Sequence, residues 1–319
     1  MSRNKLEMTT ANPAVRTSMV VVRKNFDWVP YLFILPHLIF FAVFAGFPFF
    51  LGLVISLFEY DFLRPEATRF VGLQNYANLF TSGSIEFPVF WNVLGNTFEF
   101  VLISVPLLVI IPLALALLLN INLAGKNIYR AIYFAPWVLS SAVVGLLGFW
   151  IFQSQGGLLN YYLKELGLFT PRWLSSMPWA WYAILIVTVW WTSGFNMIII
   201  LAALQNIPVT LYESASIDGA NSWQRFIYIT IPMIRPVLIF IVIITIIASF
   251  NLFAQPLFMT GGGPAQSGGG GSTEPIMIRI YHESFVRNRM GSGAAMSFVV
   301  AAIMMIISYF NFRVFRARE

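Results

Sequence analysis

The sequence predicts an all-α membrane protein with about six transmembrane helices. Apolar residues make up 58% of the 319-residue chain and charged residues only 10%, whereas soluble domains carry roughly 45–50% and about 25%. Aromatic residues are abundant, with 31 Phe and 10 Trp, which suits packing in lipid and anchoring at its interface. A soluble fold of this length could not bury so much apolar surface, so we expect lipid to surround it.

Six apolar stretches are long enough to span a bilayer, which takes roughly 20 residues. The first follows basic residues, as a signal-peptide core does. It exceeds the roughly 7–15 apolar residues of such a core, so we expect it to remain as a helix. Prolines within the stretches are compatible with spanning helices, because neighbouring helices satisfy the carbonyls that proline frees. The stretches are Pro30–Phe58, Trp91–Leu119, Ala131–Phe152, Trp179–Leu204, Pro236–Met259 and Gly293–Phe312.

The distribution of Lys and Arg predicts that both termini are cytoplasmic. Twelve of these residues fall on the side of the termini and seven on the other side. Because the charges are spread through short loops and form no single patch, they do not indicate nucleic-acid binding. The predicted organisation is a cytoplasmic tail (1–29), a transmembrane domain (30–315) and a second cytoplasmic tail (316–319). Within the domain, residues 205–235 form a cytoplasmic loop, and residues 59–90 and 260–291 form external loops.

Residues that carry chemistry are scarce, so we expect no catalytic and no metal-binding site. The chain has no Cys, which excludes disulfides and thiolate metal sites. It has only two histidines, His37 and His282, and His282 is in a loop, so a metal cluster or a Ser-His pair in the membrane is hard to build. The glycine-rich stretch Gly261–Ser272 has no Lys after its glycines and no strand before them, so it fails as a phosphate-binding loop. We expect a flexible external loop there.

The cytoplasmic loop from Gln205 to Pro232 is longer than a connection requires, and its local signals predict a helix-turn-helix. Thr210 and Glu213 have the spacing of a capping box, so a helix should begin near Leu211. Gly219 can end that helix in a left-handed conformation. A second helix then fits residues 222–231 and stops by Pro232. From local physics alone, Glu213 could merely complete the cap, Gly219 could be a plain terminator, and the loop could be a solvated connector.

The same loop resembles a known motif. Glu213-Ser214-Ala215, three residues, Gly219, nine residues and Ile229-x-Ile231-Pro232 closely match the EAA motif of binding-protein-dependent ABC importer permeases. The chain departs from it at Ser214, where Ala is usual, and at Ile231, where Leu is usual. Several further segments, spread over residues 30 to 315, resemble the carbohydrate-uptake branch: Val71–Tyr76, Asn96-Thr97, Tyr129–Ala131, Leu204–Pro208, Asp218–Ala220 and Gly261–Pro264.

The resemblance implies a type I ABC importer permease fold in a prokaryotic inner membrane. It implies that the loop couples this chain to an ATPase through Glu213, Ser214, Ala215, Ile217, Asp218, Gly219 and Ala220. The expected partners are a second homologous permease, two ATPase subunits, an external solute-binding protein and a sugar substrate. The chain has no Walker motif, so Mg-ATP should bind to the partner ATPase and no cofactor to this chain.

Polar residues within the fourth and fifth stretches are candidates for the substrate path, because polar groups in a membrane are costly and often functional. Aromatic neighbours would suit the apolar faces of a sugar ring. The alternative is helix–helix hydrogen bonding and lipid-facing aromatics. Glu99 is expected near the outer interface, and the alternative is a buried functional carboxylate. The path candidates are Trp190, Thr192, Asn196, Ser249, Phe250 and Asn251, with Trp191, Ser193, Phe195 and Gln255 close by.

Two other transport functions stay open at this point. The same machine could import glycerol phosphate or another polar solute, although no Arg cluster within the stretches favours phosphate. An ion-coupled secondary transporter is a further alternative, but such proteins often carry internal repeats and intramembrane acids. The chain has no convincing repeat, and Glu99 is the one acid of this kind.

The predicted topology can be tested by cysteine labelling, since the chain has no Cys of its own. A membrane-impermeant maleimide should label a Ser272→Cys variant in intact cells and should leave a Ser222→Cys variant unlabelled until the cells are opened. The reverse pattern would refute cytoplasmic termini.

Overall fold

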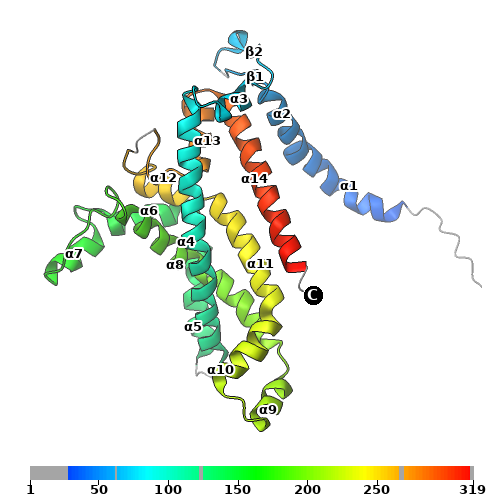
Figure 1. The fold of residues 1–319 in the computed structure, drawn as a ribbon, viewed down its shortest axis with the longest axis vertical. Coiled ribbons are helices and arrows are strands. Elements are labelled where there is room, and N and C mark those ends of the chain that lie inside the picture. The colour runs from blue at the N-terminus through cyan, green and yellow to red at the C-terminus, as the bar shows by residue number, and fades with distance from the viewer. Residues whose placement is uncertain (1–27, 62, 122–124, 266–268, 317–319) are drawn as a thin grey trace, which may run out of the picture. The chain divides into compact units, whose positions relative to one another are not determined.

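The computed structural model describes residues 28–61, 63–121, 125–265 and 269–316 as a helical protein (Figure 1). Most of the predicted terminal tails therefore lie outside the described residues. The chain divides into two compact units, residues 1–49 and 50–319. Helix α1 (Val29–Phe41) belongs to the first unit and leads through a π-helical turn, η1 (Ala42–Gly46), into α2 (Phe47–Ile55).

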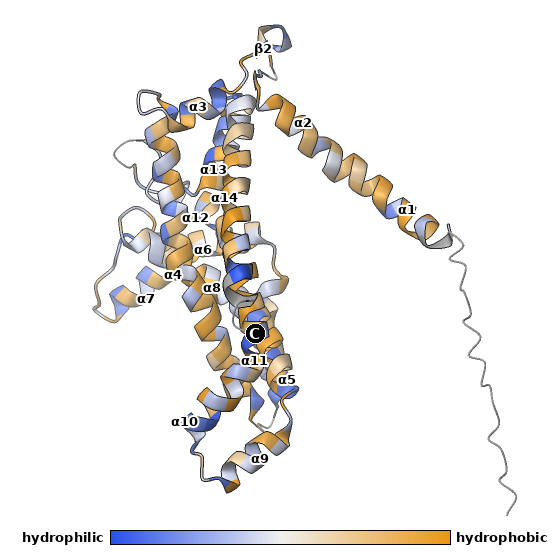
Figure 2. Ribbon diagram, turned by 45° about the vertical axis from the view of Figure 1, so that its right-hand side comes forward, coloured by the Kyte–Doolittle hydropathy of each residue, from blue (hydrophilic) through white to orange (hydrophobic). Residues whose placement is uncertain are grey.

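The second unit begins with short elements and continues with long apolar helices (Figure 2). Strands β1 (Phe58–Glu59) and β2 (Arg69–Phe70) pair antiparallel. The remaining elements are η2 (Pro65–Ala67), α3 (Gln74–Phe80), α4 (Glu86–Asn120), α5 (Lys126–Phe134), η3 (Ala135–Val138), α6 (Ser141–Phe152), α7 (Leu158–Glu165), α8 (Trp179–Gln205), α9 (Val209–Ile217), α10 (Ser222–Arg225), η4 (Phe226–Thr230), α11 (Ile231–Phe250), α12 (Ala254–Thr260), α13 (Ile276–Tyr281), η5 (His282–Val286) and α14 (Met290–Arg316).

Four of the six predicted spans correspond to unbroken candidate membrane spans among the described residues. These are Tyr31–Ile55, Glu86–Asn120, Trp179–Gln205 and Met290–Asn311. The predicted third span is instead two helical segments, Lys126–Val138 and Ser141–Phe152, bent by 97°. The bend follows Pro136, which lacks an N–H for helix continuation. Ser140 then starts α6 by accepting a hydrogen bond from the Val143 N–H.

The predicted fifth span, Pro236–Met259, was placed too late in the sequence: the helix runs from Ser222 to Phe250. The expected stop by Pro232 is wrong, because a π-turn carries the helix past that proline with the Ile231 N–H bonded to the Phe226 carbonyl. The helix ends instead at Phe250. Pro256 explains the break that follows, since its ring would clash with the Leu252 carbonyl in a continuous helix.

Helix α8 is the centre of the second unit, packing against α4, α5, α6, α11 and α12. It is the most buried of the candidate spans. Apolar side chains on the other spans remain exposed in the single chain, such as Leu102 of α4 (73% exposed) and Met305 of α14 (67%). Lipid or partner proteins must cover these surfaces.

A hydrogen bond from α8 satisfies the backbone carbonyl of α4 that Pro112 leaves without a donor. Because Pro112 lacks an N–H, the Leu108 carbonyl of α4 has no donor within its own helix. Asn196 of α8 donates its Nδ2–H to that carbonyl at 2.8 Å, and Asn196 is buried. The expectation that neighbouring helices satisfy carbonyls freed by proline is confirmed at this position. A second inter-helix bond joins Ser104 of α4 to Ser249 of α11 at 3.1 Å.

Gly194 allows α8 to approach the backbone of α5. A Cβ at this position would lie 1.9 Å from the Tyr133 carbonyl oxygen, so no side chain fits without separating the two segments. Small residues at helix contacts commonly serve this purpose in membranes.

We expect Gly194→Ala to destabilise the protein by about 3 kcal/mol, near the upper end for overpacking, because the clash is with backbone. Thermal unfolding in detergent measures the effect. The matched control is Gly95→Ala on α4, where a Cβ would meet nothing within 4 Å. The control should be neutral or gain up to about 1 kcal/mol from helix propensity. Equal melting temperatures for the two variants would contradict this account of α8 packing.

Candidate functional site

The helix-turn-helix predicted in the 205–235 loop is present as α9 and α10, at one end of the second unit (Figure 1). The Thr210–Glu213 capping box is not formed, because Pro208 sets the start of α9 and no side chain caps it. Thr210 therefore lies within the helix, and its carbonyl accepts a hydrogen bond from the Ser214 hydroxyl. A true capping box occurs at α10, where Asn221 and Gln224 bond each other's backbone N–H.

Gly219 ends the first helix as predicted, with φ +80°. Its N–H bonds the Ser216 carbonyl and the Ala220 N–H bonds the Ala215 carbonyl, which is the Schellman pattern. The predicted coupling residues lie together on this turn. Ala215 and Ala220 are half-buried, whereas the other five are exposed: Glu213, Ser214, Ile217, Asp218 and Gly219. Ile217 is 88% exposed, an apolar side chain offered to solvent or to a partner.

Polar contacts fix α9 to the helix that follows it. Arg225 of α10 donates to the Ser216 hydroxyl at 2.9 Å. The Tyr212 hydroxyl lies 2.9 Å from the Thr230 hydroxyl in η4, directly before α11. These contacts connect α9 to the segment that begins α11.

The far end of α11 borders a cavity of about 460 Å³, which we call the aromatic cavity. Of the predicted path residues, Thr192 and Asn196 of α8 and Ser249 and Asn251 at the end of α11 line it. Trp191, Phe195 and Gln255 line it as well.

Trp190 and Phe250 do not line the aromatic cavity. Trp190 is 48% exposed, because it lies two residues before Thr192 on α8, roughly 200° around the helix. Phe250 is 1% exposed and packs edge-to-face on Phe98 with ring centroids 5.2 Å apart. Ser193 is also buried elsewhere in the helix packing.

The main wall residue that the sequence reasoning missed is Trp137, which follows Pro136 at the bend between α5 and α6. Its ring stacks on Phe195 with centroids 4.7 Å apart and planes 20° apart. It also lies 5.0 Å from the Trp191 ring. Trp191 is held in turn by an Nε1–H bond to the Leu139 carbonyl. Pro136 could have indicated this position. A proline can break a span, and side chains at the break then point in directions that a continuous helix would not give them.

The described part of the glycine-rich loop contacts α4 through hydrogen bonds. Asn96 of α4 donates to the Gly271 and Glu274 carbonyls at 2.8 and 3.1 Å. Thr97 accepts the Ile276 N–H at 2.9 Å. Gly268 lies outside the described residues. In the sequence, Asn96 and Thr97 stand out only through the family resemblance, which predicts no contact for them.

Beside this loop lies a buried charge cluster centred on Glu283, which is 0% exposed. Its carboxylate accepts from Arg279, also buried, and from Arg287 at 2.7 Å. Burial lowers the pKa of Arg279, and the Glu283 carboxylate acts in the opposite direction. His282, earlier considered only as a metal or catalytic candidate, has its Nδ1 3.4 Å from Glu274.

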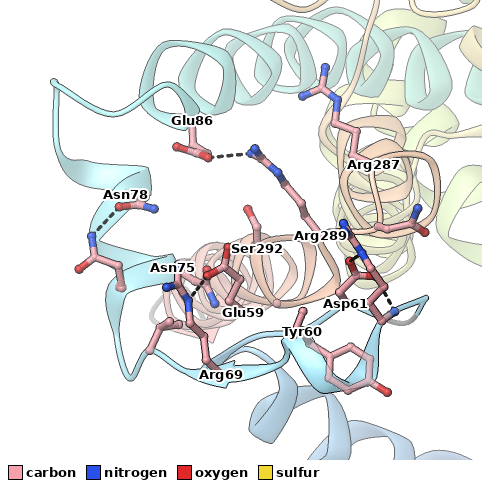
Figure 3. A pocket seen from close by; sticks show the side chains of 16 residues that line it. Glu59, Tyr60, Asp61, Arg69, Asn75, Asn78, Glu86, Arg287, Arg289 and Ser292 are labelled. Atoms are coloured by element: carbon pink, nitrogen blue, oxygen red, sulfur yellow. Dashed lines mark hydrogen bonds and ion pairs between the residues drawn. The ribbon is translucent and has the colours of Figure 1, made fainter.

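A second cavity, of about 520 Å³, lies between the β1–α3 segment and the starts of α4 and α14 (Figure 3). Ion pairs Arg69–Glu59, Arg64–Asp61 and Arg289–Glu86 cross or border this charged pocket. Hydrogen bonds, led by the one from the Leu63 N–H, hold the pKa of Asp61 below its usual value. No group of three or more potential metal ligands occurs among the described residues.

Comparison with known proteins identifies the family. Residues 90–318 match the model described as "Binding-protein-dependent transport system inner membrane component". The chain belongs to this family. It is therefore an integral inner-membrane permease and not a member of an enzyme family.

Curated relatives match over nearly the whole chain. The permease is 33% identical over 292 residues to a probable ABC transporter permease protein, YurN, of Bacillus subtilis, covering 90% of this chain and 96% of the relative. It is 33% identical to the lactose transport system permease protein LacF of Rhizobium radiobacter, covering 95% and 99%. It is 31% identical to the arabinooligosaccharides transport system permease protein AraP of Bacillus subtilis, covering 89% and 87%.

A solved structure supports the fold. A chain of a bacterial ABC transporter for import of the acidic polysaccharide alginate matches with a TM-score of 0.75 at 23% identity. The match covers 91% of this permease and 96% of that chain. The predicted type I importer fold is confirmed.

The charge cluster of the permease yields a stability prediction. Glu283→Gln leaves the buried Arg279 without a carboxylate, so we expect a loss of about 3–5 kcal/mol in unfolding free energy. The control is Glu59→Gln, which removes the exposed pair with Arg69 and should change stability by about 0–1 kcal/mol. Thermal unfolding in detergent compares the two variants. Equal changes in melting temperature would show that the buried cluster stabilises the protein no more than the exposed pair does.

Proposed function

We propose that this permease forms half of the translocation path for a sugar or oligosaccharide in an ATP-driven importer. The observation that carries the proposal is the aromatic cavity, whose lining combines the stacked rings of Trp137 and Phe195 with Asn196, Thr192 and Asn251. A sugar has apolar ring faces and a belt of hydroxyls, so it fits a wall that combines aromatic faces with amides and hydroxyls.

The names of relatives support a carbohydrate substrate. Three are permeases named for lactose, for arabinooligosaccharides and for trehalose and maltose. The alginate importer, in contrast, takes an acidic polysaccharide. The names therefore agree on carbohydrate but differ on its charge. The cavity contains no cation that would favour glycerol phosphate, so this alternative has less support.

The proposed partners are a second homologous permease, two ATPase subunits that bind Mg-ATP, and an external binding protein that delivers the sugar. A solved relative supports the last of these, since that alginate importer is in complex with a substrate-bound periplasmic protein. In this proposal the chain itself binds no cofactor. Its exposed α9 turn, with Glu213, Ile217 and Asp218, docks on the ATPase.

Helix α11 would carry the motion from the ATPase to the sugar. The Tyr212–Thr230 contact joins α9 to the start of α11, and Ser249 and Asn251 at its other end line the cavity. A helix of 20 residues is about 30 Å long. Closure of the ATPase dimer would push α9, and α11 would then shift the polar groups that contact the sugar.

We expect Gly219→Arg to lower uptake by more than tenfold and to prevent association with the ATPase. A bulky charged side chain would block docking, and φ +80° is unfavourable for any residue with a Cβ. The control is Gly219→Asn, because Asn tolerates this conformation better than other side chains. It should retain most uptake. Both variants should insert normally, as membrane fractionation would check, and normal uptake by Gly219→Arg would sink the coupling role.

A further inference from the structure

The wall of the aromatic cavity carries no charge. It is built from α4, the α5–α6 bend, α8, α11 and the start of α12, and none of its described residues is Asp, Glu, Lys, Arg or His. Its polar members are hydroxyls and amides: Ser141, Thr188, Thr192, Asn196, Thr245, Ser249, Asn251 and Gln255. The charged pocket of Figure 3 is a separate site with a different set of lining residues.

Two of these hydroxyls have already used their only proton. Thr188 donates to the Ile184 carbonyl at 2.8 Å, and Thr245 donates to the Ile241 carbonyl. Each threonine therefore offers a ligand only oxygen lone pairs. A sugar hydroxyl can donate to such an oxygen, whereas a carboxylate or phosphate oxygen is itself an acceptor and would be repelled.

The amides have a similar bias. Asn196 uses one N–H on the Leu108 carbonyl and Asn251 uses one on the Ile247 carbonyl, both at 2.8 Å. A carbonyl can only accept, so the orientation of each amide is fixed. Each keeps its carbonyl oxygen and a single N–H. Hydroxyl groups, which both donate and accept, match this mixed inventory, whereas an anion would find some neutral donors but no cation to balance its charge.

We infer that this cavity selects uncharged saccharides and rejects sugars that carry a carboxylate, sulfonate or phosphate. The inference rests on the proposed function and specifies the substrate class. Moving an anion from water into a cavity without a cation removes its hydration and supplies no compensating charge. The aromatic side chains of the wall, such as Trp137 and Phe195, can make apolar contacts with a neutral sugar but do not offset the lost hydration of an anion.

Matched neutral and anionic sugars provide the test. The purified importer, with its companion permease and ATPases but without the binding protein, is titrated with radiolabelled lactose, maltotriose and arabinotriose. The carboxylate counterparts, obtained by oxidation of the reducing end, are measured in parallel with the neutral alditols of the same sugars, because oxidation and reduction both open the terminal ring. We expect at least tenfold tighter binding of the neutral member of whichever pair binds. Equal or tighter binding of the carboxylate member overturns the inference while leaving the proposed function intact.

A charged residue introduced into the cavity wall tests whether this chain sets the preference for neutral sugars. Thr192→Lys should raise affinity for the carboxylate sugar at least fivefold and weaken binding of its neutral counterpart. Thr192→Gln, similar in length but uncharged, should keep the neutral preference. If the Lys variant assembles normally by size-exclusion chromatography but the preference stays unchanged, this cavity does not set the charge selectivity. Absence of both binding and uptake for every neutral sugar in the set would overturn the proposed function itself.

Discussion

The rest of the bundle depends on the hydrogen bond from Asn196 to the Leu108 carbonyl. A carbonyl freed by proline in a membrane helix needs a donor from a neighbouring helix or from a water-lined cavity. Pro112 frees this carbonyl and α8 supplies the donor, which fixes the register of α8 against α4. Gly194, two residues away, allows the same stretch of α8 to reach the backbone at Tyr133. Around residues 194–196, α8 therefore contacts both α4 and α5.

The aromatic cavity lies at this level because three breaks in regular helix occur around it. Pro112 interrupts the bonding of α4, Pro136 precedes the bend between α5 and α6, and Pro256 follows the end of α11. At each break, polar groups or aromatic side chains line the cavity, and α8 forms the rest of the wall. Asn196 has both roles considered for it, since it bonds a neighbouring helix and lines the cavity.

The sequence predicted features that depend on local chemistry better than those that depend on three-dimensional context. Gly219 was predicted correctly because a left-handed turn strongly favours glycine. The capping box was misplaced, since Pro208 starts α9 earlier than the Thr210 pattern suggests. Apolar runs located the spans but not their ends, because lipid-facing sequence looks alike on both sides of a break. Trp137 was missed for the same reason, and the contacts of Asn96 with a loop about 175 residues away leave no local signal.

If the aromatic cavity is part of the transport path, as proposed, water must reach its wall in the assembled importer. A single cysteine tests it most directly, because the chain has none of its own. In the assembled importer, Thr192→Cys in the cavity wall should react with a small hydrophilic methanethiosulfonate at least tenfold faster than Ile186→Cys, a position on the outer surface of the same helix that is 51% exposed in the single chain. Transported sugar should slow the reaction of the Thr192→Cys variant only. Equal reaction rates at the two positions, with no protection by sugar, would contradict the claim.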